Sequence, residues 1–125
     1  MARVLIIDDD ANFVKTLREE FRSQTRQSSR RINNIVSVNS REKANEVLQT
    51  MLADAVILSE NMLDEVGLEL LRKLQRTFGF IQIIILSTSI HDVSADKQLA
   101  GIRFTRYDKQ STTAKAVAHA GLIGR

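Results

Sequence analysis

The chain contains no cysteine, and this absence excludes several kinds of bond and site. None of its 125 residues is Cys, which excludes disulfide bonds, thiolate metal sites and cysteine nucleophiles. Long hydrophobic runs are missing too, since none approaches the roughly 18 residues of a membrane-spanning helix. The N-terminus also lacks the layout of a signal peptide. We therefore expect a cytoplasmic protein without a membrane partner.

Signatures of a metabolic enzyme are absent as well. The chain has only five Gly and no glycine-rich loop of the kind that holds a nucleotide phosphate, and it has no nucleophile–base pair. Aromatic residues make up 5% of the sequence. They are not interleaved with basic residues in the way that single-stranded nucleic-acid sites require. We therefore do not expect an enzyme.

What is present indicates one soluble globular domain. A length of 125 residues supports a single hydrophobic core. The shares of hydrophobic (43%) and charged (26%) residues are ordinary for such proteins. We expect one domain over residues 1–125, and any effector domain would lie beyond Arg125 in a longer parent protein.

Five segments have the character of β-strands. The runs at residues 4–7, 55–58 and 81–86 are continuously apolar, as parallel strands covered on both faces require. The more polar segments at residues 35–38 and 103–107 are typical of edge strands. The pattern predicts a sheet with three central strands and two edges.

Helical patterns separate these strands. Apolar residues recur every three to four positions in the first and third intervening segments, which predicts amphipathic helices. Asn39 and Glu42 form a capping-box pattern before the second helix, and Gly79 and Gly101 follow the third and fourth. The predicted helices cover residues 11–22, 39–52, about 68–78, and 93–100. A last helix is capped by Ser111 or Thr112 and runs to residue 120.

This alternation predicts an α/β fold, a five-stranded parallel sheet with helices on both faces and right-handed crossovers. In such sheets, ligands bind near the carboxyl ends of the strands. Asp10 there is best explained as the cap of the first helix. The other polar residues at or beyond these ends are Asp8, Asp9, Ser59, Ser87 and Lys109.

These residues resemble the phosphoryl site of response-regulator receiver domains, the CheY-like superfamily of two-component phosphorelay signalling. Asp8 and Asp9 match the acid pair that, in that family, helps to hold Mg²⁺ after the first strand. Ser87 matches the hydroxyl that follows the fourth strand, and Lys109 the lysine after the fifth. The resemblance implies a (βα)5 flavodoxin-like receiver fold over the whole chain.

The chain departs from the family at the residue that accepts the phosphoryl group. In the family this residue is an aspartate at the end of the third strand, and here Ser59 stands in its place. A hydroxyl is a weak nucleophile without an activating base and a poorer Mg²⁺ ligand than a carboxylate. The resemblance therefore implies a pseudo-receiver, with no cofactor or only a weak Mg²⁺ site at Asp8 and Asp9.

Further departures concern the segments that transmit the signal in the family. The family usually has proline where this chain has Leu63 and Gln110. Its switch aromatic would fall on Arg106, with Tyr107 one place off. We expect a signalling surface formed by Arg103, Arg106 and Tyr107.

Three functions follow as hypotheses. The first is a receiver-like domain that is not phosphorylated on aspartate and acts by protein–protein interaction with a histidine kinase, an effector domain or a second subunit. The second is a working phosphorelay receiver that uses a displaced acid, Glu60 or Asp64. The third is binding of nucleic acid or an acidic partner through residues 22–31, although a solvated helix end and loop also explain that segment. Its basic residues are Arg22, Arg26, Arg30 and Arg31.

Overall fold

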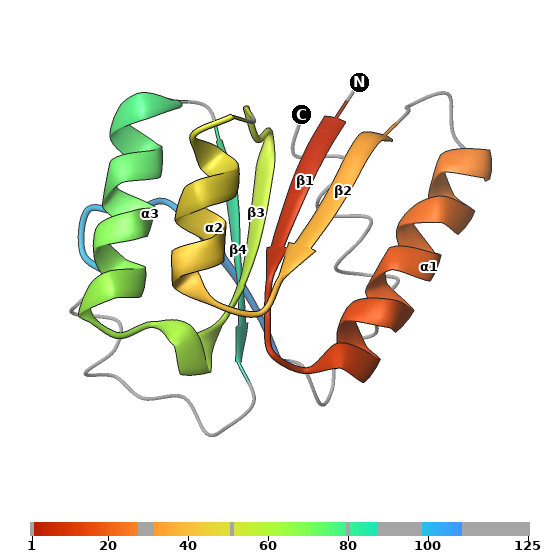
Figure 1. Ribbon diagram of the computed structural model, residues 1–125, viewed down its shortest axis with the longest axis horizontal. Coiled ribbons are helices and arrows are strands. Elements are labelled where there is room, and N and C mark those ends of the chain that lie inside the picture. The colour runs from red at the N-terminus through yellow and green to blue at the C-terminus, as the bar shows by residue number, and fades with distance from the viewer. Residues whose placement is uncertain (1, 28–31, 51, 80, 88–98, 109–125) are drawn as a thin grey trace.

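The fold is a five-stranded parallel β-sheet with helices on both faces (Figure 1). The computed structural model describes residues 2–27, 32–50, 52–79, 81–87 and 99–108. The strand order is β2-β1-β3-β4-β5, and each neighbouring pair is parallel. The strands are β1 (Ala2–Ile7), β2 (Ile32–Val38), β3 (Ala55–Ser59), β4 (Gln82–Ser87) and β5 (Thr105–Asp108).

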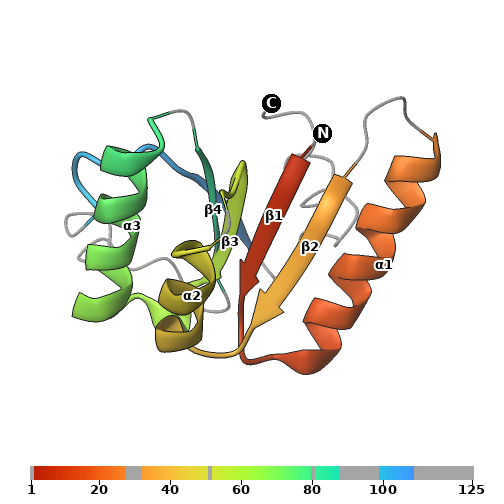
Figure 2. The same ribbon diagram turned by 45° about the horizontal axis from the view of Figure 1, so that its top comes forward.

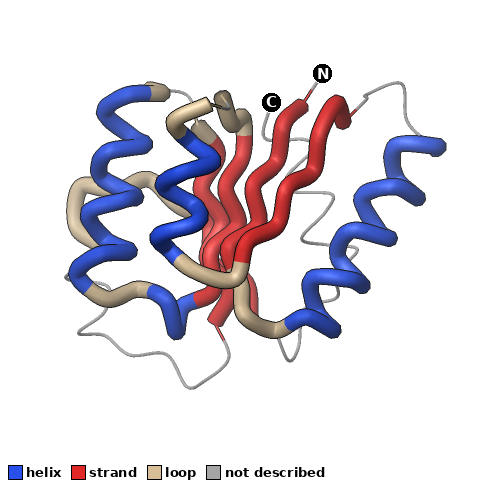
Figure 3. Tube along the Cα trace, viewed as in Figure 1, coloured by secondary structure: helices blue, strands red, loops and turns tan. Residues whose placement is uncertain are grey.

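The described helices divide between the two faces of the sheet. Helix α1 (Ala11–Gln27) covers one face, while α2 (Arg41–Leu48) and α3 (Glu65–Thr77) lie side by side on the other (Figure 3). A single 3-10 turn, η1 (Glu60–Met62), connects β3 to the segment before α3. Among the described helices, none is long and apolar enough to span a membrane.

The core has two layers because successive strand side chains point to opposite faces. Leu17 and Phe21 of α1 are fully buried against one face of β1, β3 and β4. Ala44 of α2 and Leu71 of α3 are fully buried against the other. Both faces of the central strands are thus covered, which explains why their sequences are continuously apolar.

The structure confirms the five predicted strands and the two predicted edges. Strands β2 and β5 lie at the ends of the strand order. The boundaries differ by one to three residues. Pairing extends β1, β2 and β3 beyond the predicted runs, whereas β4 and β5 begin and end later than predicted. Most of the predicted helix at residues 93–100, and all of the one ending at 120, lie outside the described residues.

The cap of α2 was predicted one residue too early. Ser40, rather than Asn39, is the N-cap, and its hydroxyl accepts from the Lys43 backbone N–H at 3.2 Å. The helix ends at Leu48 rather than at residue 52, and a turn follows. Ser40 and Asn39 are both good capping residues, so composition alone did not distinguish them.

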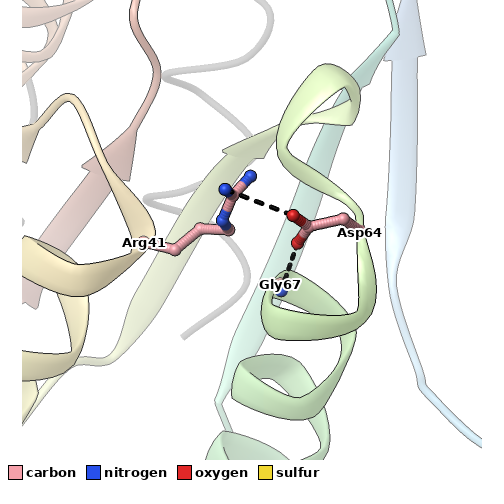
Figure 4. A network of polar contacts seen from close by, with 3 residues as sticks. All are labelled: Arg41, Asp64 and Gly67. Carbon is pink, nitrogen blue, oxygen red and sulfur yellow. Dashed lines mark hydrogen bonds and ion pairs between the residues drawn. The ribbon is translucent and has the colours of Figure 1, made fainter.

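Helix α3 begins earlier than its apolar stripe indicated because Asp64 caps it. The Asp64 Oδ1 accepts from the Gly67 backbone N–H at 3.0 Å, and its Oδ2 pairs with the Arg41 guanidinium at 3.2 Å (Figure 4). Gly67 is buried in this first turn, where a Cβ would clash with the carbonyl oxygen of Met62. The connection from β3 to α3 therefore requires a residue without a side chain at position 67.

We expect Gly67→Ala to lower the free energy of unfolding by about 1–3 kcal/mol, because the added methyl must displace backbone. Chemical denaturation monitored by circular dichroism measures the change. Gly79→Ala is the matched control, since a Cβ there meets no atom within 4 Å. Equal stability of the two variants would contradict the close approach at position 67.

Candidate functional site

The carboxyl edge of the sheet carries three buried polar side chains. Asp8, Ser59 and Ser87 are 3%, 1% and 3% exposed, and no other polar or charged residue in the described ranges is buried to this degree. Ile7 pairs with Leu58 and Ser59 with Leu86. Asp8, Ser59 and Ser87 thus end adjacent strands at nearly the same level. Because burying polar groups is costly unless they are satisfied, their concentration at one edge marks it as the candidate site.

The segment after β1 is held by its own acidic residues. The Asp8 backbone N–H donates to the Val38 carbonyl of β2 at 3.1 Å, and Asp8 Oδ1 accepts from the Asp10 backbone N–H at 3.0 Å. Asp10 in turn accepts from the Phe13 backbone N–H at 3.1 Å. This confirms Asp10 as the cap of α1. Asp9 is left exposed at the edge of the site.

Asn61, which sequence reasoning missed, links the serine to the acid pair. The Ser59 hydroxyl donates to Asn61 Oδ1 at 2.5 Å, and Asn61 Nδ2 donates to Asp9 Oδ1 at 3.4 Å. Asn61 lies in η1, two residues after Ser59. The only sequence signal for it was an amide side chain close to the strand end. The contact turns the hydroxyl proton of Ser59 toward Asn61.

The oxygen atoms at this edge suit a weakly held cation better than a tight one. Asp8 and Asp9 supply the carboxylates, and Asn61 an amide oxygen; across the described residues, no cluster of three or more His, Cys, Asp or Glu side chains is placed to hold a metal. Mg²⁺ is commonly held by one or two carboxylates together with phosphate oxygens and water. The donor set therefore fits Mg²⁺ only through Asp8 and Asp9, with a neutral hydroxyl beside them.

Glu60 is directed to β5. Its Oε1 lies 2.7 Å from an Arg106 guanidinium nitrogen, and the two side chains are 16% and 17% exposed. The guanidinium also lies over the Phe104 ring, 5.7 Å from its centroid. Arg106 is paired with Ile85 across β4 and β5, on the face covered by α3. The sequence offered Glu60 only as a possible displaced acceptor and did not predict this ion pair.

Asp64, the second acid considered as a displaced acceptor, makes structural contacts with both of its carboxylate oxygens. One oxygen caps α3 and the other pairs with Arg41 (Figure 4). Both of its carboxylate oxygens thus serve the junction of α2 and α3.

The predicted signalling residues have different environments. Arg103 is exposed, and its guanidinium donates to the Gly79 carbonyl at 2.7 Å. Tyr107 is half-buried and packs on the core layer below α1, whereas Arg106 pairs with Glu60. Lys109 lies outside the described residues. So do Arg30 and Arg31 of the basic segment, while Arg22 is exposed on α1.

Solved structures of known proteins share this fold. A response regulator receiver domain protein (CheY-like) from Methanospirillum hungatei is 12% identical, with a TM-score of 0.71 over 95% of this chain and 89% of that one. A two-component transcriptional regulator AraC from Clostridium phytofermentans is 14% identical, with a TM-score of 0.80 over 99% and 92%. The response regulator TrrA from Thermotoga maritima, solved in complex with Mg(2+)-BeF, is 22% identical, with a TM-score of 0.68 over 98% and 100%.

At these identities the structures show the fold alone. No curated protein sequence matches the chain. The family model of the response regulator receiver domain, however, matches residues 4–104, which is most of the chain. Receiver domains are signalling domains of two-component systems, and the matched region contains the acid pair, Ser59 and Ser87. On this match, together with its five-stranded parallel sheet, the chain belongs to the response regulator receiver domain family.

Proposed function

We propose that this chain is a pseudo-receiver, a receiver domain that is not phosphorylated on aspartate and that signals by protein–protein interaction. The observation that carries the proposal is Ser59. It ends β3, is 1% exposed, and is hydrogen-bonded to Asn61. It has no negative charge to offer a cation, and its hydroxyl donates to the neutral Asn61 amide rather than to a base that would activate it.

The surroundings of Glu60 and Asp64 argue against a displaced acceptor. Glu60 is paired with Arg106 at 2.7 Å, and Asp64 serves as a helix cap and as the partner of Arg41. Attack on phosphorus by either acid would first require it to leave a cation that stabilises it. We therefore rank the working phosphorelay receiver below the pseudo-receiver.

The Glu60–Arg106 pair supports regulation by a fixed conformation. It joins the segment directly after Ser59 to β5, the strand that carries the proposed signalling residues Arg103, Arg106 and Tyr107. A pair that is more than four-fifths buried is weakly screened by solvent. We propose that it holds β5 in one arrangement, which a histidine kinase, an effector domain or a second subunit would recognise.

Binding of nucleic acid or an acidic partner through residues 22–31 has less support. Arg22 is the one arginine of that segment whose side chain the structure describes. The described part of the segment is the end of α1, in keeping with a solvated helix end.

Acetyl phosphate with Mg²⁺ tests the phosphorylation claim directly. We expect intact-mass spectrometry of the wild-type protein to show no added phosphoryl group, because the acceptor carboxylate is missing. A stoichiometric adduct would contradict the proposal. Its loss in Glu60→Gln or Asp64→Asn would then identify a displaced acceptor.

Restoring the acid should restore cation binding. In Ser59→Asp, a carboxylate is buried near Asp8, and we expect a lower melting temperature without metal because like charges repel. Mg²⁺ should then stabilise this variant by roughly 2.7 kcal/mol at about a hundredfold excess over Kd. Ser59→Asn is the neutral control of similar shape, and its melting temperature should respond to Mg²⁺ no more than that of the wild type. Equal responses of the two variants would show that the rest of the pocket is not that of a receiver.

A double-mutant cycle tests the Glu60–Arg106 pair. We expect Glu60→Gln and Arg106→Gln each to lower the free energy of unfolding by about 1.5–3 kcal/mol, and their coupling energy to be about 1–2 kcal/mol. The Glu69–Arg76 pair is the control, because its side chains are 63% and 70% exposed at a separation of 3.3 Å. Its coupling should stay below about 0.5 kcal/mol. Similar couplings in the two cycles would remove the support for a fixed β5.

A further inference from the structure

A groove between α2 and α3 has the features of a docking surface. It has a volume of about 660 Å³. Helices α2 and α3, whose residues line it, lie on the face of the sheet opposite α1 (Figure 2). Its apolar lining includes Leu70 and Val66, and Val66 is 52% exposed, one of two large hydrophobic residues in the described ranges that are so exposed. An apolar channel between two helices is a common receptor for another helix.

The rims of the groove are acidic, although the chain as a whole is basic. Two acids come from each helix, at helical spacings that place them along the channel. Two cations also line it, and one of them, Arg41, is already paired with Asp64. No ion pair or hydrogen bond within the described residues engages the side chains of Glu42, Glu46 or Glu65. The four acidic residues are Glu42, Glu46, Glu65 and Glu69.

The same chain carries a basic stripe of matching character on α1. Lys15, Arg18 and Arg22 recur at i, i+3 and i+7, so they lie along one flank of the helix. Together with Ala11 and Val14 they line a cleft of about 540 Å³. Lys15 and Arg22 are exposed. Glu19 interrupts the stripe on the helix, and Asp8 and Asp9 also line the cleft. With Lys43, its four cations exceed its three acids by one charge.

Helix α1, which carries the stripe, lies on the opposite face of the sheet from α2 and α3, which form the groove (Figures 1 and 2). The α1 flank spans about 10 Å from Lys15 to Arg22, and the acids on each helix span about 6 Å at the 1.5 Å rise per residue. One copy can therefore lay its stripe over the groove of the next. Because the two surfaces differ, the contact is heterologous and leaves one groove and one stripe open at the ends.

We propose that the α2–α3 groove binds the α1 basic stripe of a second copy of this chain, giving head-to-tail self-association. The inference goes beyond the proposed function. Asp8 and Asp9 of the candidate site line the cleft beside the stripe, but its surfaces do not include Ser59 or the Glu60–Arg106 pair. Its test measures association rather than phosphorylation, so either proposal can fail while the other stands.

Sedimentation velocity of the full chain tests the proposal. At low ionic strength we expect the mean mass to rise above the 14.1 kDa monomer as concentration increases. In roughly 0.5 M salt it should return to the monomer value, because exposed charges are then screened. A protein that stays monomeric at every concentration in low salt overturns the proposal, even if its groove binds an unrelated basic peptide.

Charge reversal on each surface provides the decisive step. Glu46→Lys reverses a charge in the groove and leaves the stripe intact. Arg22→Glu reverses a charge in the stripe and leaves the groove intact. Each should weaken self-association at least about tenfold. Mixed together, the two variants should form a 1:1 complex, because one supplies an intact groove and the other an intact stripe. Failure of the mixture to associate, as a symmetric dimer would require, overturns the head-to-tail contact.

Two further variants separate the role of the apolar contact from that of net charge. Val66→Ser removes the apolar contact without altering charge, and it should also weaken association. Glu20→Lys makes the same charge change as Glu46→Lys on a residue of α1 that lines neither surface, and it should associate like the wild type. An equal loss in Glu20→Lys and Glu46→Lys would show that net charge rather than the groove governs association, which overturns the proposal.

Discussion

The main physical constraint on this structure is that polar side chains are buried at one edge of an otherwise apolar parallel sheet. Asp8, Ser59 and Ser87 end adjacent strands and are almost inaccessible to solvent. A hydrophobic core alone gives no reason for polar residues there, because unsatisfied buried polar groups destabilise a fold. Asp8 and Ser59 are satisfied by short local contacts, from the Asp10 backbone N–H to Asp8 and from the Ser59 hydroxyl to Asn61. The edge is thus a buried polar site with a neutral hydroxyl between two other polar strand ends.

The residues around Ser59 are engaged in structural contacts. With a serine at position 59, Asn61 spans the gap to Asp9, and Glu60 is engaged by Arg106 on β5. Asp64 joins α2 to α3 through Arg41. Acids near the site therefore act as structural partners of cations and helix ends. On our account, a site that would respond to phosphorylation in a receiver has become a fixed part of the scaffold.

Much of this arrangement was predictable from sequence, and the failures have physical causes. Continuous apolar runs predicted β1, β3 and β4, because residues covered on both faces must all be apolar. Spacing from strand ends correctly placed Asp8, Ser59 and Ser87 at one edge. The Glu60–Arg106 and Arg41–Asp64 pairs were not predicted, since they join side chains 46 and 23 positions apart through tertiary packing. The cap of α2 was missed because two good capping residues stood next to each other.

The central claim is that the pocket no longer accepts a phosphoryl group, and one titration tests it most directly. ¹⁵N-labelled wild-type protein is titrated with Mg²⁺ and then with beryllofluoride, a phosphoryl mimic, while the amides of Asp9, Ser59 and Ser87 are followed. The account predicts at most small, unsaturated shifts with Mg²⁺ and no further change with beryllofluoride. Saturable shifts with beryllofluoride that require Mg²⁺ would contradict it, because they would mean that another acid has taken over the role of the missing aspartate.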